Sequence, residues 1–249
     1  MNIKELTDLA NSGDIKAIYS LGKYYLNIEK ELDNAIKWFT TGAKKCSEKC
    51  MHMLASTIAS KSVMLRKQSE SPNYFDIISM LDNALYWDNK AAESGSEDKD
   101  THNTICSEIG ISYYFLSIDP KTDADHSMLY LEIAISYLKP LYSILFSTES
   151  IFYLGCSLHD YSLFGKTSSK DTELAFRILK NCVDDYFNEL PSMATVSYCV
   201  GMMYAEGRGC HKNFNRALHY FQQAHNAGYD CSKVLNRFEK NLFGGYNFI

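Results

Sequence analysis

The fold is decided by residues 198–228, which read Tyr198-Cys-Val-Gly-Met-Met-Tyr-Ala-Glu-Gly-Arg-Gly-Cys-His-Lys-Asn-Phe-Asn-Arg-Ala-Leu-His-Tyr-Phe-Gln-Gln-Ala-His-Asn-Ala-Gly228. Apolar and small residues recur at helical spacing in each half, which predicts two amphipathic helices. Gly207 and Gly209 interrupt the first helix, and Gly228 is the residue type that commonly ends a helix. The stretch therefore predicts an αα-hairpin in which Gly201 allows another backbone to come close.

This hairpin resembles the Sel1-like repeat, a relative of the tetratricopeptide repeat. The family pattern places a small residue and Leu-Gly-x-x-Tyr before a Gly-x-Gly turn, and Ala, two aromatic residues, Ala and Gly after it. The matching positions are Val200, Gly201, Tyr204, Gly207, Gly209, Ala217, Tyr220, Phe221, Ala224 and Gly228.

Weaker copies of the pattern run through the rest of the chain. They predict repeats at about 14–46, 47–96, 98–145, 147–188 and 192–228, with the glycine-equivalent positions at 22, 55, 110, 155 and 201. A helix over 3–12 is expected to cap the start, and a helix over about 230–242 is expected to cap the end. The aromatic tail after it either folds back on the array or serves as a recognition segment.

The resemblance implies an all-α fold, a right-handed superhelix of about five helix-turn-helix repeats of the Sel1-like and tetratricopeptide-like kind with terminal capping helices. Because such repeats bury a continuous core only by stacking, we expect one α-solenoid domain over residues 1–249.

Several local departures from the pattern are expected. Asp14 can cap the first helix of the first repeat, and a tight turn should replace the Gly-x-Gly motif at 27–33. An insertion at about 61–75 should lengthen two helices and form a surface loop, and residues 97–100 should form an acidic linker. Pro140 should kink or end its helix early.

Composition and charge narrow the class of protein. The net charge is −5 and the basic residues are mixed with acidic ones, which argues against a nucleic-acid-binding surface. The first residues show no apolar secretory segment, and no window approaches 18 apolar residues, so we expect a cytoplasmic protein without membrane insertion. Abundant Asn, Lys and Ile fit an AT-rich, bacterial genome.

The eight cysteines do not recur at equivalent repeat positions, which favours free and mostly buried thiols over a disulfide framework. Cys210, His211, His219, His225 and Cys231 lie near one another in sequence, but His219 and His225 are six apart and point to different faces of a helix. No phosphate loop or nucleophile motif occurs. We therefore expect no catalytic residue, no metal and no cofactor.

The resemblance also implies that the first helix of each repeat lines a concave face. The candidate partner-binding residues on this face are Tyr19, Lys23, Asn27, His52, Tyr114, Phe152, His159, Tyr198 and Met202. Aromatic residues mixed with small polar ones suit an extended or helical peptide. The alternative is that the aromatic side chains pack against the next repeat.

Sel1-like proteins act as adaptors, so the resemblance implies a non-catalytic scaffold for protein–protein interaction that binds a protein or peptide partner. A second hypothesis is an immunity or inhibitor protein that blocks a toxin or enzyme stoichiometrically, since a mildly acidic surface suits a basic target. A third is a metal-dependent enzyme that uses the C-terminal His and Cys residues.

Overall fold

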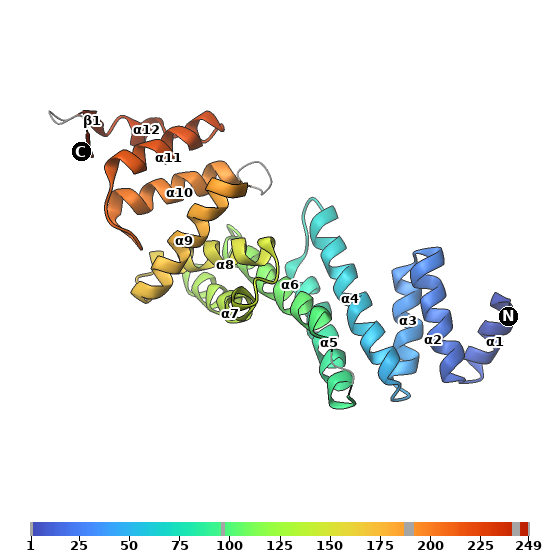
Figure 1. Cartoon of the computed structure of the whole chain (residues 1–249). Helices are drawn as coiled ribbons and strands as arrows, with labels where there is room; N and C mark the ends of the chain where they lie inside the picture. Colours follow the sequence, from blue (N-terminus) through green and yellow to red (C-terminus); the bar gives the residue numbers. More distant parts are fainter. Residues whose placement is uncertain (1, 96–97, 187–191, 241–244, 249) are drawn as a thin grey trace. The chain divides into compact units, whose positions relative to one another are not determined.

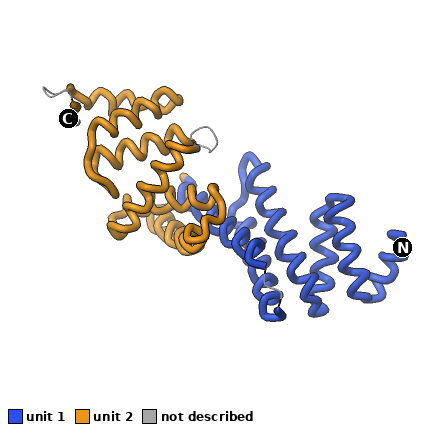
Figure 2. Tube along the Cα trace, viewed as in Figure 1, with its two compact units in different colours: residues 1–119 blue, residues 120–249 orange. Residues whose placement is uncertain are grey.

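The chain folds into two compact units, residues 1–119 and residues 120–249 (Figure 2). The structure is a computed structural model that describes residues 2–95, 98–186, 192–240 and 245–248. It is all-α except for one short β-hairpin within the described residues, which confirms the expected fold class. The single-domain organisation over 1–249 stays a prediction.

The first unit is a series of antiparallel helices, each packed against the next one in the chain (Figure 1). A π-helical turn, η1, prolongs the second helix, and the connection that follows it is only Lys30 and Glu31, as tight as the sequence predicts. The elements are α1 Ile3–Asn11, α2 Ile15–Tyr24, η1 Tyr25–Glu29, α3 Leu32–Ala43, α4 Glu48–Gln68, α5 Tyr74–Glu93 and α6 Lys99–Ser117.

The second unit continues the same construction with consecutive helices in contact and ends in the hairpin. Its elements are α7 Ala124–Ser143, α8 Thr148–Leu163, α9 Ser169–Tyr186, α10 Met193–Glu206, α11 Phe214–Asn226, α12 Ser232–Leu235, β1 Phe238–Lys240 and β2 Tyr246–Phe248. The helices of the third predicted repeat, α6 and α7, belong to different units.

Polar side chains fix where many of these helices begin. The Asp14 carboxylate accepts a hydrogen bond from the Ala17 amide at 2.8 Å, which confirms the expected cap of α2. Such caps satisfy amide groups that have no partner inside the helix. The other side chains that cap in the same way are Asn2, Asn73, Asp98, Asp123, Ser147 and Asn213.

The helix glycines Gly22 and Gly201 make room for an aromatic ring, whereas the sequence suggested the close approach of a backbone. A Cβ atom on Gly201 would lie 2.8 Å from Cε1 of Phe221, and one on Gly22 would lie 2.5 Å from Cε1 of Phe39. Both phenylalanines are fully buried. The two hairpins thus share one packing solution, in which the ring of the second helix sits over the glycine of the first.

At three places where the sequence predicts an insertion, an early helix end or a linker, helices take up more of the chain than expected. The insertion at 61–75 extends α4 and α5 and leaves only residues 69–73 as a loop. Pro140 does not end α7 early, because the helix runs on to Ser143. The expected acidic linker is a helix start, since Asp98 caps α6 and Asp100 lies in its first turn, whereas Glu97 lies outside the described residues.

The C-terminal capping helix expected over 230–242 is not formed. Instead, α12 ends at Leu235, and β1 pairs antiparallel with β2 so that Phe238 lies opposite Phe248. The two rings are 5.0 Å apart, and Phe248 also stacks on Phe214 at 6.1 Å. Phe238 contacts Phe221 and Phe248 contacts Phe214, and both of these partners lie on α11. The described part of the tail, residues 245–248, therefore folds back, which is one of the two alternatives that the sequence left open.

Among the residues that the structure describes, no helix combines the length and the apolar character needed to cross a membrane. All eight cysteines are free, as expected, and four of them, Cys50, Cys156, Cys182 and Cys231, are buried.

Candidate functional site

Three of the predicted partner-binding residues follow one another along α2 and η1. The Tyr19 ring lies 6.2 Å from the ring of Phe39, and the Lys23 ammonium lies 5.8 Å from the centre of the Tyr19 ring. Tyr19 is half-buried, while Lys23 and Asn27 are exposed. Tyr19 therefore packs on Phe39 of its own repeat and also has the Lys23 ammonium over its ring.

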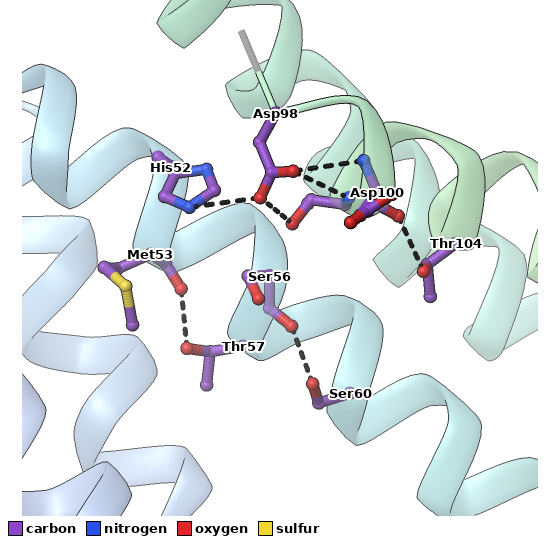
Figure 3. A network of polar contacts seen from close by, with 9 residues as sticks. His52, Met53, Ser56, Thr57, Ser60, Asp98, Asp100 and Thr104 are labelled. Carbon is purple, nitrogen blue, oxygen red and sulfur yellow. Dashed lines mark hydrogen bonds and ion pairs between the residues drawn. The ribbon is translucent and has the colours of Figure 1, made fainter. Parts of the chain in front are cut away.

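His52 lies in a polar network between α4 and the start of α6 (Figure 3). Its Nε2 atom is 3.4 Å from Oδ2 of Asp98, and Asp98 also accepts hydrogen bonds from the Thr101 hydroxyl and from the amides of Asp100 and Thr101. Partial burial acts to raise the pKa of Asp98, but these hydrogen bonds and the charge of His52 outweigh it and lower the pKa. His52 thus links α4 to the start of α6, and these are the first helices of the second and third predicted repeats.

The other ring nitrogen of His52, Nδ1, is buried and has no hydrogen-bond partner among the described residues. Buried polar atoms usually find a partner, so this atom is available to a ligand or to ordered water.

Three more predicted residues are largely packed inside their units. Phe152 is 3% exposed and lies edge-to-face on Tyr153, and His159 is 5% exposed with Nδ1 2.9 Å from Asp160. Tyr114 is half-buried beside Phe115, with 5.7 Å between the rings. Phe152 and His159 therefore belong to the interior of the folded chain.

Tyr198 and Met202, one turn apart on α10, line a hollow of about 260 Å³ in the second unit. The Tyr198 ring lies 4.8 Å from the ring of Tyr229 and 5.4 Å from that of Phe221, so its position is fixed by stacking on both. The remaining lining residues come from the segment after α11 and are Asp230, Lys233, Val234 and Arg237.

The charges in this hollow are two cations and one carboxylate. Hydrogen bonds from Ser232 lower the pKa of Asp230, and burial raises the pKa of the Tyr198 hydroxyl, which stays neutral. The Arg237 guanidinium lies 4.0 Å from the centre of the Phe248 ring, so the folded-back tail holds it in place. An aromatic wall next to Lys233 and Arg237 can accept a side chain or terminus that carries a carboxylate.

The sequence did not identify Tyr229, Lys233 and Arg237 as part of a site. They line the hollow beside Tyr198 and Met202 of α10, with Tyr229 before the short α12, Lys233 within it and Arg237 between α12 and β1. One sequence signal could have found them. Lys233 and Arg237 are basic residues four positions apart, and they follow the helix-ending Gly228 and the aromatic Tyr229.

A Cys-His-Asp arrangement in the first unit was also missed. Nδ1 of His102 lies 2.8 Å from Asp88, and Nε2 lies 3.5 Å from the sulfur of Cys106. Burial, followed by the negative charge of Asp88, raises the pKa of Cys106 to about 11. At neutral pH the thiol is therefore protonated, and this order of contacts does not supply the thiolate that nucleophilic catalysis needs.

The His and Cys residues near the C-terminus do not converge. The Cys210 sulfur lies 3.6 Å from the Met203 carbonyl oxygen, and His219 packs edge-on against Tyr220. Across the described ranges, no group of three or more His, Cys, Asp or Glu side chains is placed to hold a metal ion.

Comparison with known proteins identifies three of the hairpins. The model of the Sel1 repeat family matches residues 15–45, 148–180 and 198–229, which correspond to the first, fourth and fifth predicted repeats. The sequence-based resemblance to this family is thereby confirmed. No curated protein matches the chain.

Among solved structures, the crystal structure of a Sel1 repeat protein from Oxalobacter formigenes is similar to this chain. The match covers 91% of this chain and 85% of that chain, with 17% sequence identity and a TM-score of 0.32. A TM-score this low does not establish a common arrangement of the repeats.

Proposed function

The chain carries Sel1 repeats, and from this premise we propose that it is a non-catalytic scaffold or adaptor that binds a peptide or protein partner. Sel1 repeats usually mediate protein–protein interaction. In this chain each unit offers its own proposed docking surface on a first helix. The first unit carries Tyr19, Lys23 and Asn27 on α2 and η1, and the second unit carries Tyr198 and Met202 on α10.

The observation that supports the proposal most directly is the hollow beside Tyr198 and Met202. This hollow of about 260 Å³ brings together a rigid aromatic ring, an adaptable methionine and two basic side chains. Aromatic and arginine side chains dominate binding energy in protein interfaces, and methionine adapts to ligands of different shape. A volume of this size accommodates one or two peptide side chains and not a whole small-molecule substrate.

Selection of peptides on the intact protein tests the proposal. A random library of twelve-residue peptides is panned on the wild-type chain, and the affinities of the enriched peptides are measured by fluorescence anisotropy. We expect the Met202→Glu and Lys233→Glu double variant to bind them at least tenfold more weakly, because both changes place negative charge where a carboxylate should dock.

Leu163→Glu is the matched control, since Leu163 is 61% exposed at the end of α8 and does not line the hollow. Equal affinities for wild type, double variant and control would show that the peptides bind elsewhere. Tight, one-to-one inhibition of a single enzyme or toxin would instead support the inhibitor hypothesis.

A cytoplasmic location in a bacterial cell is part of the same proposal. Eight free cysteines are stable in a reducing compartment, and the residue usage fits an AT-rich bacterial genome.

A further inference from the structure

A second hollow lies in the second unit between α9, α10, α11 and the turn that connects the last two. Its volume is about 460 Å³, and it shares no lining residue with the hollow beside Tyr198. The residues that argue for a ligand are Phe176, Arg177, Lys180, Tyr204 and Arg216.

The rings of Phe176 and Tyr204 form the apolar base of this groove. Phe176 meets Tyr204 edge-to-face at 5.0 Å, and Tyr204 stacks on Tyr220 at 5.7 Å with 16° between the planes. The turn that forms one wall is tightly seated, because a Cβ on Gly209 would lie 2.3 Å from the Thr172 carbonyl oxygen. The groove is thus preformed, which lowers the entropic cost of binding.

Two guanidinium groups in the groove are held by tyrosine hydroxyls and not by carboxylates. Arg216 Nη1 donates to the Tyr204 hydroxyl at 3.0 Å, with its Cζ atom 5.6 Å from the centre of that ring. Arg177 Nη2 donates to the Tyr142 hydroxyl at 3.4 Å. Neither arginine forms an ion pair with a carboxylate in the part of the chain that the structure describes.

Two other arginines of this chain do pair with carboxylates. Arg66 forms a buried two-point ion pair with Glu108, at 2.7 and 2.9 Å, and Arg208 pairs with Glu206. The chain has more acidic than basic residues, 30 against 25, so carboxylates are not scarce. Two arginines fixed by neutral acceptors retain donors that a carboxylate can accept from in two-point geometry.

A neighbouring hollow of about 350 Å³ extends the groove along α11. It shares Lys180 and Arg216 with the first and adds Asn215, His219 and Tyr220. Lys180 is paired with Asp184 at 2.5 Å, and the Tyr220 hydroxyl donates to the same carboxylate at 2.8 Å, so this acidic residue is already used. A ligand that follows both hollows is extended and meets arginine at more than one point.

We propose that this groove is a second docking surface and that it binds an acidic peptide segment, with an apolar side chain on the aromatic base and carboxylates on Arg177 and Arg216. The single acidic lining residue is Glu173, against three basic ones, which gives the groove a charge opposite to that of the whole chain. This surface is separate from the hollow beside Tyr198, so the proposal goes beyond the scaffold function and does not depend on it.

The test uses the full-length protein and a fluorescein-labelled twelve-residue peptide in which Glu and Asp alternate with Leu and Phe. Fluorescence anisotropy gives its Kd for the wild type and for Arg177→Gln with Arg216→Gln. We expect at least a tenfold rise in Kd for this double variant, and a comparable rise for the peptide with Gln and Asn in place of its acids. Binding should also weaken between 50 and 300 mM NaCl, because exposed charges are screened.

Lys166→Gln with Lys170→Gln is the matched control, because it removes the same charge from exposed positions of the same unit outside the groove. Circular dichroism checks that each variant remains folded. Equal losses in both double variants would reduce the effect to net charge and overturn the proposal. The proposal is also overturned if the acidic peptide does not bind, or if a labelled single-stranded oligonucleotide of twelve bases binds more tightly with the same arginine dependence.

Discussion

Single residues in this chain often serve two contacts at once, and Asp98 is the clearest example. Its carboxylate caps α6 through the amides of Asp100 and Thr101, and it also pairs with His52 on α4. The first contact fixes where a helix begins, and the second ties that helix to its neighbour (Figure 3). Replacing Asp98 with Asn separates the two contributions, because the amide oxygen of Asn can still cap the helix but the side chain has no negative charge to pair with His52.

We therefore expect Asp98→Ala to lower the free energy of unfolding by about 1 kcal/mol at pH 7, the usual cost of a lost cap. Asp98→Asn should cost less than half of that, because the amide oxygen still caps the helix. Since the folded-state pKa of Asp98 is lowered, its stabilisation is present above the unfolded-state pKa and is lost as the pH falls through the folded-state pKa. Urea titrations of wild type and both variants at pH 7 and near pH 3 measure this. A difference between wild type and Asp98→Ala that grows on acidification would contradict the assignment.

How far the sequence predicts single residues depends on what covers them. The cap at Asp14 could be predicted because it depends only on the next three residues. The helical period also placed Phe152 on the first-helix face, but its exposure depends on the rest of the fold, and Phe152 is buried. His52 was expected at a docking surface, and its pairing with Asp98 could not be predicted because it joins residues 46 positions apart.

At the scale of elements, one pairing of helices recurs in both units. The glycine of the first helix faces a fully buried phenylalanine of the second, Gly22 with Phe39 and Gly201 with Phe221. These contacts join residues that are 17 and 20 positions apart and equivalent in the repeat pattern, so a periodic sequence places both members of each pair, although it suggested a backbone and not a ring beside the glycine. The C-terminal hairpin has no counterpart in the repeat pattern, and its strands pair so that Phe238 lies opposite Phe248. Helical periodicity alone therefore predicted a helix there.

Replacing the helix glycine tests this pairing. In an exposed helix, Gly→Ala stabilises by roughly 0.5–1 kcal/mol. At position 201 the new Cβ would lie 2.8 Å from the Phe221 ring, so we expect Gly201→Ala to destabilise by about 1–3 kcal/mol, as overpacking does. Chemical denaturation gives the value.

A double-mutant cycle with Phe221→Leu supplies the control, because the smaller side chain makes room for the methyl group. The combined variant should lose less stability than the sum of the two single variants. Strict additivity would mean that the ring and the glycine do not interact, and the shared packing solution would then be wrong.

At the scale of the whole molecule, stability in such an array is the sum of local terms. Each described helix packs mainly against its neighbours in sequence, and the chain separates into two compact units (Figure 2). In repeat proteins this organisation makes folding units partly independent. A damaged core in one unit should therefore leave the other protected.

Hydrogen exchange followed by mass spectrometry checks this expectation with a reciprocal pair of variants. Phe39→Ala and Phe221→Ala each remove a fully buried ring, at a cost of about 3–5 kcal/mol. We expect Phe39→Ala to speed amide exchange in α2, α3 and α4 while α10 and α11 keep their wild-type protection, and Phe221→Ala to do the reverse. A uniform loss of protection through both units in either variant would mean that the chain unfolds as one cooperative domain, because only global unfolding exposes helices that do not contact the altered ring.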